Sequence, residues 1–151
     1  MEIVDFRPDL APAFRALNEA WITSLFALEP KDREVLGDPA AKIVAPGGAV
    51  LFALDGGEPV GCCALMALED GGFEVAKMAV ADSHKGRGLG RALMAACVER
   101  ARTAGAPRLY LETNSKLAPA LGLYRSFGFV QIEPPEPSPY ARADVVMELR
   151  L

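Results

Sequence analysis

A glycine-rich segment in the second half of the sequence constrains the fold more strongly than any other feature. An apolar alternating stretch runs up to Val80, and the turn after it carries three glycines at alternate positions, Gly86, Gly88 and Gly90, before a long helix-periodic stretch. Glycines let backbone N–H groups approach an anion without interference from a Cβ atom. A helix N-terminus adds unsatisfied donors and the positive end of a dipole. The segment therefore predicts a strand, a phosphate-binding turn and a helix in succession.

Three cations accompany these glycines in a chain that is otherwise acidic. Lys85, Arg87 and Arg91 lie in or beside the turn, whereas the whole chain has 20 acidic and 16 basic residues and a net charge of -4. Such a balance cannot build the broad positive surface that nucleic acids require, so no nucleic acid partner is expected. The spacing matches neither a dinucleotide fingerprint nor a GxxxxGK[ST] P-loop, which disfavours NAD and ATP. The turn best suits a diphosphate.

The apolar periodicity predicts a single domain over residues 1–151, of the α/β (α+β) class. Helices are expected at 14–28, 32–44, 88–103 and 117–127, and strands at 3–6, 49–54, 59–68, 73–80, 108–114, 129–132 and 145–151. The strand–helix–strand unit from residue 73 to 114 predicts local parallel pairing. The expected architecture is a mixed, mostly antiparallel central sheet of about six to seven strands, flanked by about four helices.

The cysteines and the N-terminus predict a cytoplasmic protein with no membrane association. Cys62 and Cys63 are adjacent and would face opposite sides of a strand, and Cys97 lies in a helical pattern, so buried free thiols in a reducing compartment are expected. The first residues carry acids where a secretory signal needs a basic region. No apolar run approaches the ~20 residues that cross a bilayer.

The segment from Glu74 to Phe129 resembles the core of the GNAT superfamily of N-acetyltransferases. In that family a glutamine or arginine, two variable residues, a glycine, any residue, and a glycine or alanine wrap the diphosphate of coenzyme A. Residues 85–90, Lys-Gly-Arg-Gly-Leu-Gly, match this pattern. Lys85 replaces the usual first residue, which keeps the charge but loses a planar fork. The resemblance implies a GNAT-like fold and acetyl-CoA as cosubstrate, and no metal is expected.

The resemblance also implies which residues contact the coenzyme. Main-chain groups on the strand before the turn would pair with the pantetheine arm, the turn would hold the diphosphate, and an asparagine would border the thioester. The implied coenzyme-binding residues are Met78, Ala79, Val80, Lys85, Gly86, Arg87, Gly88, Leu89, Gly90, Arg91 and Asn114.

Acylation of an amine requires a base, since an alkyl ammonium with a pKa of about 10.4 must lose its proton at a cost of about 4–5 kcal/mol at neutral pH. Glu74 is the first candidate, because the resemblance puts family bases on its strand. Glu112 is the second, since Tyr110, Glu112 and Asn114 alternate onto one strand face. Either carboxylate could instead be structural and paired with a neighbouring cation.

Tyr124 is the candidate general acid, because a phenol stays protonated at neutral pH and can protonate a departing thiolate. The alternative is a tyrosine that simply packs in the core.

Trp21 is expected in the core, on a helix that lines the acceptor pocket in the resemblance. Tyr140, in a proline-rich loop, either closes over the acceptor or anchors the loop. His84 is expected to be exposed and incidental, with no partners for a metal site.

These features predict an N-acetyltransferase that moves an acetyl group from acetyl-CoA to a primary amine by direct attack in a ternary complex, since no cysteine is positioned for a ping-pong route. The alternative is a non-catalytic acyl-CoA-binding or sensor module, and a small nucleotide-phosphate binder is a more distant one. The sequence does not decide whether the acceptor is a polyamine, an amino acid, an antibiotic or a protein N-terminus. The loops at 27–48 and 134–142 are expected to surround it. Edge strands could pair two subunits into a homodimer.

Overall fold

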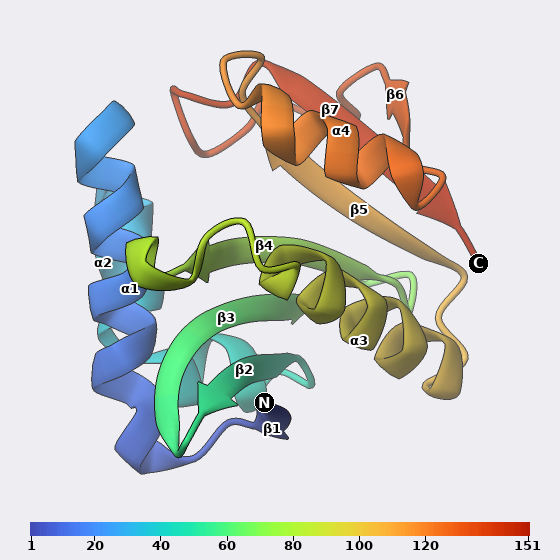
Figure 1. Ribbon diagram of the computed structural model, residues 1–151. Helices are drawn as coiled ribbons and strands as arrows, with labels where there is room; N and C mark the ends of the chain where they lie inside the picture. Colours follow the sequence, from blue (N-terminus) through green and yellow to red (C-terminus); the bar gives the residue numbers. More distant parts are fainter.

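A single seven-stranded sheet organises the computed structural model, which describes all residues from 1 to 151 (Figure 1). The strand order is β1-β2-β3-β4-β5-β7-β6. The strands are β1 (Glu2–Asp5), β2 (Ala49–Asp55), β3 (Glu58–Ala67), β4 (Phe73–Val80), β5 (Arg108–Thr113), β6 (Val130–Ile132) and β7 (Val145–Arg150). The α-helices are α1 (Ala11–Leu25), α2 (Pro30–Gly37), α3 (Leu89–Thr103) and α4 (Ala118–Ser126). Two short 3₁₀ helices, η1 (Pro8–Leu10) and η3 (Asp82–His84), and a π-helix, η2 (Ala40–Val44), complete the helical segments.

Only one pair of neighbouring strands is parallel, as the strand–helix–strand unit predicted. β4 and β5 pair in register only at Phe73 with Leu109 and at Glu74 with Tyr110, whereas every other pair of neighbours is antiparallel. Beyond Glu74 the two strands diverge (Figure 1). The mixed, mostly antiparallel sheet and the four α-helices confirm the predicted fold class.

The sheet separates two apolar cores. Side chains of α3 and α4 pack on one face, and side chains of α1 and α2 pack on the other. The adjacent residues Cys63 and Cys62 belong to the first and second core respectively, because successive side chains of a strand point to opposite faces. Both thiols and that of Cys97 are buried and free, as predicted.

The N-terminal helices differ from the sequence-based expectation. The predicted helix at 32–44 is two elements, α2 and η2, because Pro39 lacks an N–H and its predecessor Asp38 leaves the helical region, at φ -154° and ψ 71°. The first helix ends at Leu25, and that residue is 60% exposed rather than buried. The buried face of α1 is instead formed by Phe14, Asn18 and Ile22, spaced by four residues.

A β-bulge interrupts β4 where it passes the centre of the sheet. Ala76 pairs with Ala64 and Ala79 pairs with Cys62, so two residues of β4 lie opposite one residue of β3. Lys77, in this bulge, has a φ of 54° and is the only non-glycine residue with a positive φ. The bulge turns the Lys77 side chain toward α2, where it is buried. No helix has both the length and the hydropathy needed to cross a bilayer.

Candidate active site

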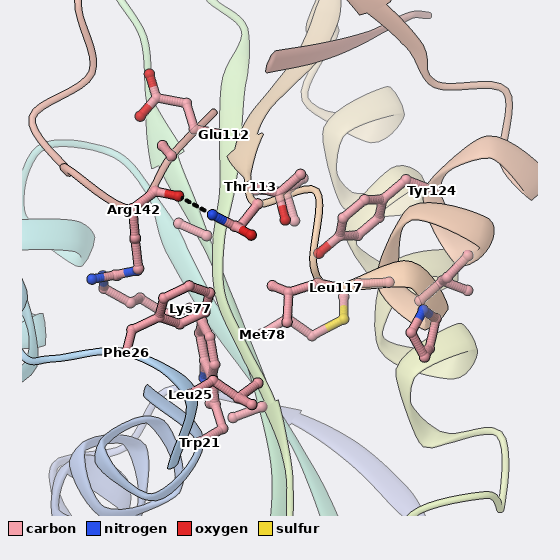
Figure 2. A pocket seen from close by; sticks show the side chains of 18 of the residues that line it. Trp21, Leu25, Phe26, Lys77, Met78, Glu112, Thr113, Leu117, Tyr124 and Arg142 are labelled. Atoms are coloured by element: carbon pink, nitrogen blue, oxygen red, sulfur yellow. Dashed lines mark hydrogen bonds between the residues drawn. The ribbon is translucent and has the colours of Figure 1, made fainter. Parts of the chain in front are cut away.

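A cavity of about 390 Å³ opens where β4 and β5 diverge (Figure 2). The residues of β4 from Val75 to Val80 and the end of β5 line it. Tyr124 of α4 lies on one side, and Trp21 of α1 and Arg142 of the C-terminal loop (residues 133–144) lie on the other (Figure 2). Tyr140 of the same loop also lines the cavity. The cavity therefore brings together residues from both halves of the chain.

The glycine-rich turn lies between β4 and α3, at one end of this cavity. Gly86 has a φ of 78° and Gly88 a φ of 80°, and Gly88 is the N-cap of α3. A Cβ atom at either position would meet no protein atom within 4 Å. These glycines are therefore required by the left-handed backbone, and the open space outside them suits an anion at the N-terminus of a 15-residue helix.

The cations of this segment have different surroundings. Lys85 lines the cavity and forms an exposed ion pair with Asp82 at 2.8 Å. Arg91 donates to the Ser126 hydroxyl group at 3.1 Å, so it ties α3 to α4. Arg87 is exposed and makes no ion pair, and the Leu89 side chain belongs to the core. The structure thus leaves Lys85 and Arg87 as the side chains best able to meet a diphosphate.

Glu74 lines the cavity and is the last residue of β4 that pairs with β5. Burial and the nearby charge of Glu112 raise the pKa of Glu74 to about 7, against the smaller opposing effect of the charges of Lys77 and Lys31. A carboxyl group with such a pKa exchanges a proton readily at neutral pH, which is the property that a general base needs.

Glu112 lies on β5 beside Glu74 and is held by neutral donors. The Tyr110 hydroxyl group donates to Oε2 at 2.9 Å, and the Ser138 hydroxyl group donates to Oε1 at 2.6 Å. Neither Glu112 nor Glu74 forms an ion pair with a lysine or arginine, although the charges of Lys77 and Lys31 act on Glu74 from a greater distance.

Tyr124 directs its hydroxyl group into the cavity, toward Met78 and Leu117 (Figure 2). Its ring packs against Phe129, with 6.0 Å between the ring centroids. Burial raises the pKa of Tyr124 above its ordinary value, so the phenol stays protonated at neutral pH. The residue packs in the core through its ring and offers a proton to the cavity through its oxygen.

Asn114 lies at the end of β5, but both ends of its side chain are used within the protein. Nδ2 donates to the Arg142 carbonyl oxygen at 2.6 Å, and Oδ1 accepts from the Lys116 N–H at 2.8 Å. These bonds connect β5 to the C-terminal loop and shape the edge of the cavity.

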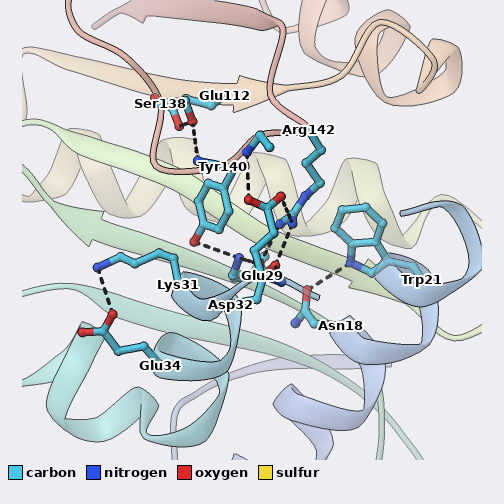
Figure 3. A network of polar contacts seen from close by, with 12 residues as sticks. Asn18, Trp21, Glu29, Lys31, Asp32, Glu34, Glu112, Ser138, Tyr140 and Arg142 are labelled. Atoms are coloured by element: carbon cyan, nitrogen blue, oxygen red, sulfur yellow. Dashed lines mark hydrogen bonds and ion pairs between the residues drawn. The ribbon is translucent and has the colours of Figure 1, made fainter. Parts of the chain in front are cut away.

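A buried ionic network, which sequence reasoning missed, contributes Lys77, Tyr140 and Arg142 to the lining of the cavity (Figure 3). Asp32 is fully buried and accepts from Lys77 Nζ at 2.6 Å and from both terminal nitrogens of Arg142 at 2.7 Å. Lys77 also donates to the Tyr140 hydroxyl group at 3.1 Å, and Arg142 reaches Glu29 at 3.3 Å. The only local signal was a capping box between Glu29 and Asp32, which predicts a helix start but not these distant partners.

His84 is not exposed as expected. Its side chain is 15% exposed, its Nε2 lies 2.8 Å from Asp55 Oδ2, and its Nδ1 lies 2.7 Å from the Ser83 hydroxyl oxygen. It therefore connects the turn after β4 to the hairpin of β2 and β3, a contact between segments that the local sequence does not indicate. No cluster of three or more His, Cys, Asp or Glu side chains is arranged to hold a metal ion.

Comparison with known proteins identifies the family. The model of the Acetyltransferase (GNAT) family matches residues 9–129. The uncharacterised N-acetyltransferase YsnE of Bacillus subtilis is 38% identical over 120 residues, which are 78% of this chain and 78% of that protein. A GNAT-family acetyltransferase from Staphylococcus aureus Mu50 superposes with a TM-score of 0.89 at 16% identity, over 99% of this chain and 98% of that chain. YncA, a putative acetyltransferase from Salmonella typhimurium solved with acetyl-CoA, superposes with a TM-score of 0.76 at 22% identity, over 99% and 93%.

The class of protein that these findings define is an acyltransferase, built on a sheet whose central strands diverge around a cavity. The chain belongs to the GNAT acetyltransferase family, since the family match covers most of its length and the Bacillus relative aligns over more than two thirds of it. The resemblance noted from residues 74–129 is confirmed.

Proposed function

We propose that the protein transfers the acetyl group of acetyl-CoA to a primary amine, by direct attack while both substrates are bound. The single observation that carries the proposal is the shared cavity: Glu74, Tyr124 and the main chain of β4 line one space that continues to Lys85. A base, an acid and a coenzyme-binding strand are therefore within reach of the same reacting atoms.

The residues present fit coenzyme A. Gly86 and Gly88 leave an open, left-handed turn at the N-terminus of α3, which suits the diphosphate. Lys85 and Arg87 add charge beside it, and the divergence of β4 from β5 exposes strand backbone along which the pantetheine arm can lie. Acetyl-CoA, when bound, supplies the thioester carbonyl that the amine attacks.

Proton transfer falls to two side chains. Glu74 takes a proton from the ammonium of the acceptor, and its pKa of about 7 allows this at neutral pH. Glu112 keeps that pKa high through its charge and is the second candidate for the base. Tyr124 donates its phenolic proton to the sulfur that leaves, and the second proton that the attacking nitrogen loses on forming the amide restores the phenol. The buried ring of Tyr124 holds the hydroxyl group in the cavity.

A covalent route through cysteine is disfavoured. All three thiols are fully buried in the two cores, and burial raises the pKa of Cys62 to about 12. The thiolate is the nucleophilic form of cysteine, so a buried thiol of this kind is inert. This favours direct attack by the amine.

The test combines binding with turnover. Titration calorimetry with coenzyme A, ATP and NAD should give binding for coenzyme A alone, and release of free thiol from acetyl-CoA should depend on an added amine. A protein that binds coenzyme A but releases no thiol with any of a broad set of amines would be the non-catalytic acyl-CoA-binding module. Equal binding of ATP would point to a general nucleotide-phosphate binder instead.

A further inference from the structure

The charges that line the cavity are unevenly compensated. Its three cations are all paired to aspartates: Lys77 and Arg142 to Asp32, and Lys85 to Asp82. Its two carboxylates, Glu74 and Glu112, are paired with no cation. The charge left without an ion-pair partner in the cavity is therefore negative: that of Glu112, joined by that of Glu74 as the pH rises through about 7.

Arg142 and Lys77 are not free to pair with a charged group of a substrate. Arg142 forms a two-point contact with Asp32, both bonds 2.7 Å long, and Glu29 accepts a further bond. The side chains of Lys77 and Asp32 are 3% and 0% exposed. A substrate carboxylate would have to break these bonds in a site with little solvent. The free energy lost with these bonds would exceed the free energy gained from the new contact.

An apolar wall lines the same cavity, on the side opposite Tyr124 (Figure 2). Trp21 and Phe26 contact edge to face, with 6.5 Å between ring centroids, and Leu25 is 60% exposed. The indole N–H of Trp21 already donates to Asn18 at 3.1 Å, so Trp21 offers only apolar surface to a ligand. Such a wall suits an aromatic or branched apolar group.

We propose, on the basis of the function proposed above, that the acceptor is a primary amine with an apolar or aromatic body and no carboxylate near the amine. The ammonium group meets Glu74 and Glu112, and the apolar body lies against Trp21, Leu25 and Phe26. An α-amino acid is rejected, because its carboxylate would lie near two unpaired carboxylates with no free cation to receive it.

The experiment compares acceptors that differ only in the carboxylate. The kcat/KM for thiol release from acetyl-CoA is measured with phenethylamine, phenylalanine and phenylalaninol, in which a hydroxymethyl group replaces the carboxylate. Phenethylamine and phenylalaninol should exceed phenylalanine by roughly 100-fold or more, since like charges in a poorly solvated site repel strongly. Putrescine, which has a cationic chain without an apolar body, should be a poor acceptor.

The variant Glu112→Gln tests the cause of the selectivity. Removing one carboxylate should narrow the ratio of phenethylamine to phenylalanine about tenfold, while coenzyme A binding stays at the level of the parent. A ratio unchanged in this variant would contradict the electrostatic explanation.

The remaining outcomes separate this inference from the function on which it rests. Phenylalanine as the better acceptor, or putrescine as the best one, would overturn the inference while acetyl transfer stands. Coenzyme A binding without thiol release from any of these amines would overturn acetyl transfer, and the inference with it.

Discussion

Arg142 and Asp32, 110 residues apart in the chain, form a two-point ion pair in which both terminal nitrogens of the guanidinium group lie 2.7 Å from the two carboxylate oxygens. This pair fastens the C-terminal loop to α2 beside the cavity. Lys77, from the bulge of β4, joins the same carboxylate. One fully buried aspartate therefore connects three elements beside the cavity that is proposed to bind the acceptor amine.

Asp32→Asn should destabilise the protein by about 3–5 kcal/mol, because it leaves two buried cations without their partner. Burial raises the pKa of Asp32, but hydrogen bonds from Arg142 and Lys77 outweigh this and hold the pKa well below its ordinary value. The contribution of the pair to stability is thus present above about pH 4 and lost as the pH falls further. Thermal unfolding from neutral to acid pH should show this loss in the parent and not in the variant.

The matched control for that variant lies on the same helix. Glu34 pairs with Lys42 at 3.2 Å, but both side chains are exposed. Glu34→Gln should therefore change the free energy of unfolding by less than about 1 kcal/mol. Similar losses in the two variants would show that the buried network adds nothing beyond a surface pair.

Glu74→Gln should remove the acidic limb of the pH profile of kcat/KM. With a pKa of about 7, Glu74 becomes a competent base as the pH rises through neutrality, so the activity of the parent should rise with a midpoint there. The variant should also be about 100-fold slower or more. Steady-state thiol release across pH measures both effects.

Glu112→Gln should move the same limb without abolishing it. The charge of Glu112 raises the pKa of Glu74, so its removal should shift the midpoint of the parent's limb to lower pH. If the limb instead disappears in Glu112→Gln and persists in Glu74→Gln, Glu112 is the base.

Tyr124→Phe should lower turnover by about 100-fold or more while coenzyme A affinity is unchanged. The substitution keeps the ring that packs 6.0 Å from Phe129 and removes only the hydroxyl group. Titration calorimetry and the melting temperature serve as controls for binding and folding. Turnover equal to that of the parent across pH would leave Tyr124 with a packing role alone.

Gly88→Ala should weaken coenzyme A binding more than it weakens the fold. A Cβ atom at residue 88 meets no protein atom, so the cost to stability is the left-handed strain of about 1–2 kcal/mol. Gly105, at the other end of α3, has a φ of 75° and an equally open surround. Gly105→Ala should therefore lower the melting temperature similarly and leave coenzyme A affinity intact, and equal losses of affinity in both variants would refute a diphosphate role for residue 88.

Much of the fold could be predicted from the sequence because its signals are local. Alternating apolar residues marked β4 over Phe73–Val80 at its observed bounds, and glycines followed by a periodic apolar stripe marked the start of α3. The parallel pairing of β4 with β5 followed from the chain connection between them. The polar Asn18 on the buried face of α1 was missed, because a polar residue on a buried face interrupts the apolar pattern. The break at Pro39 was missed although its signal is local, since a proline inside a helical pattern breaks the helix.

The sequence by itself determined the family, the glycine-rich turn and the candidate residues Glu74 and Tyr124, since these depend on residue type and short spacing. Only the tertiary structure decided that Asp32 neutralises Lys77 and Arg142, and that Glu74 and Glu112 face the cavity without a cation. The physical reason is that burial and charge pairing depend on contacts between residues 45 and 110 positions apart, about which local sequence patterns carry no information.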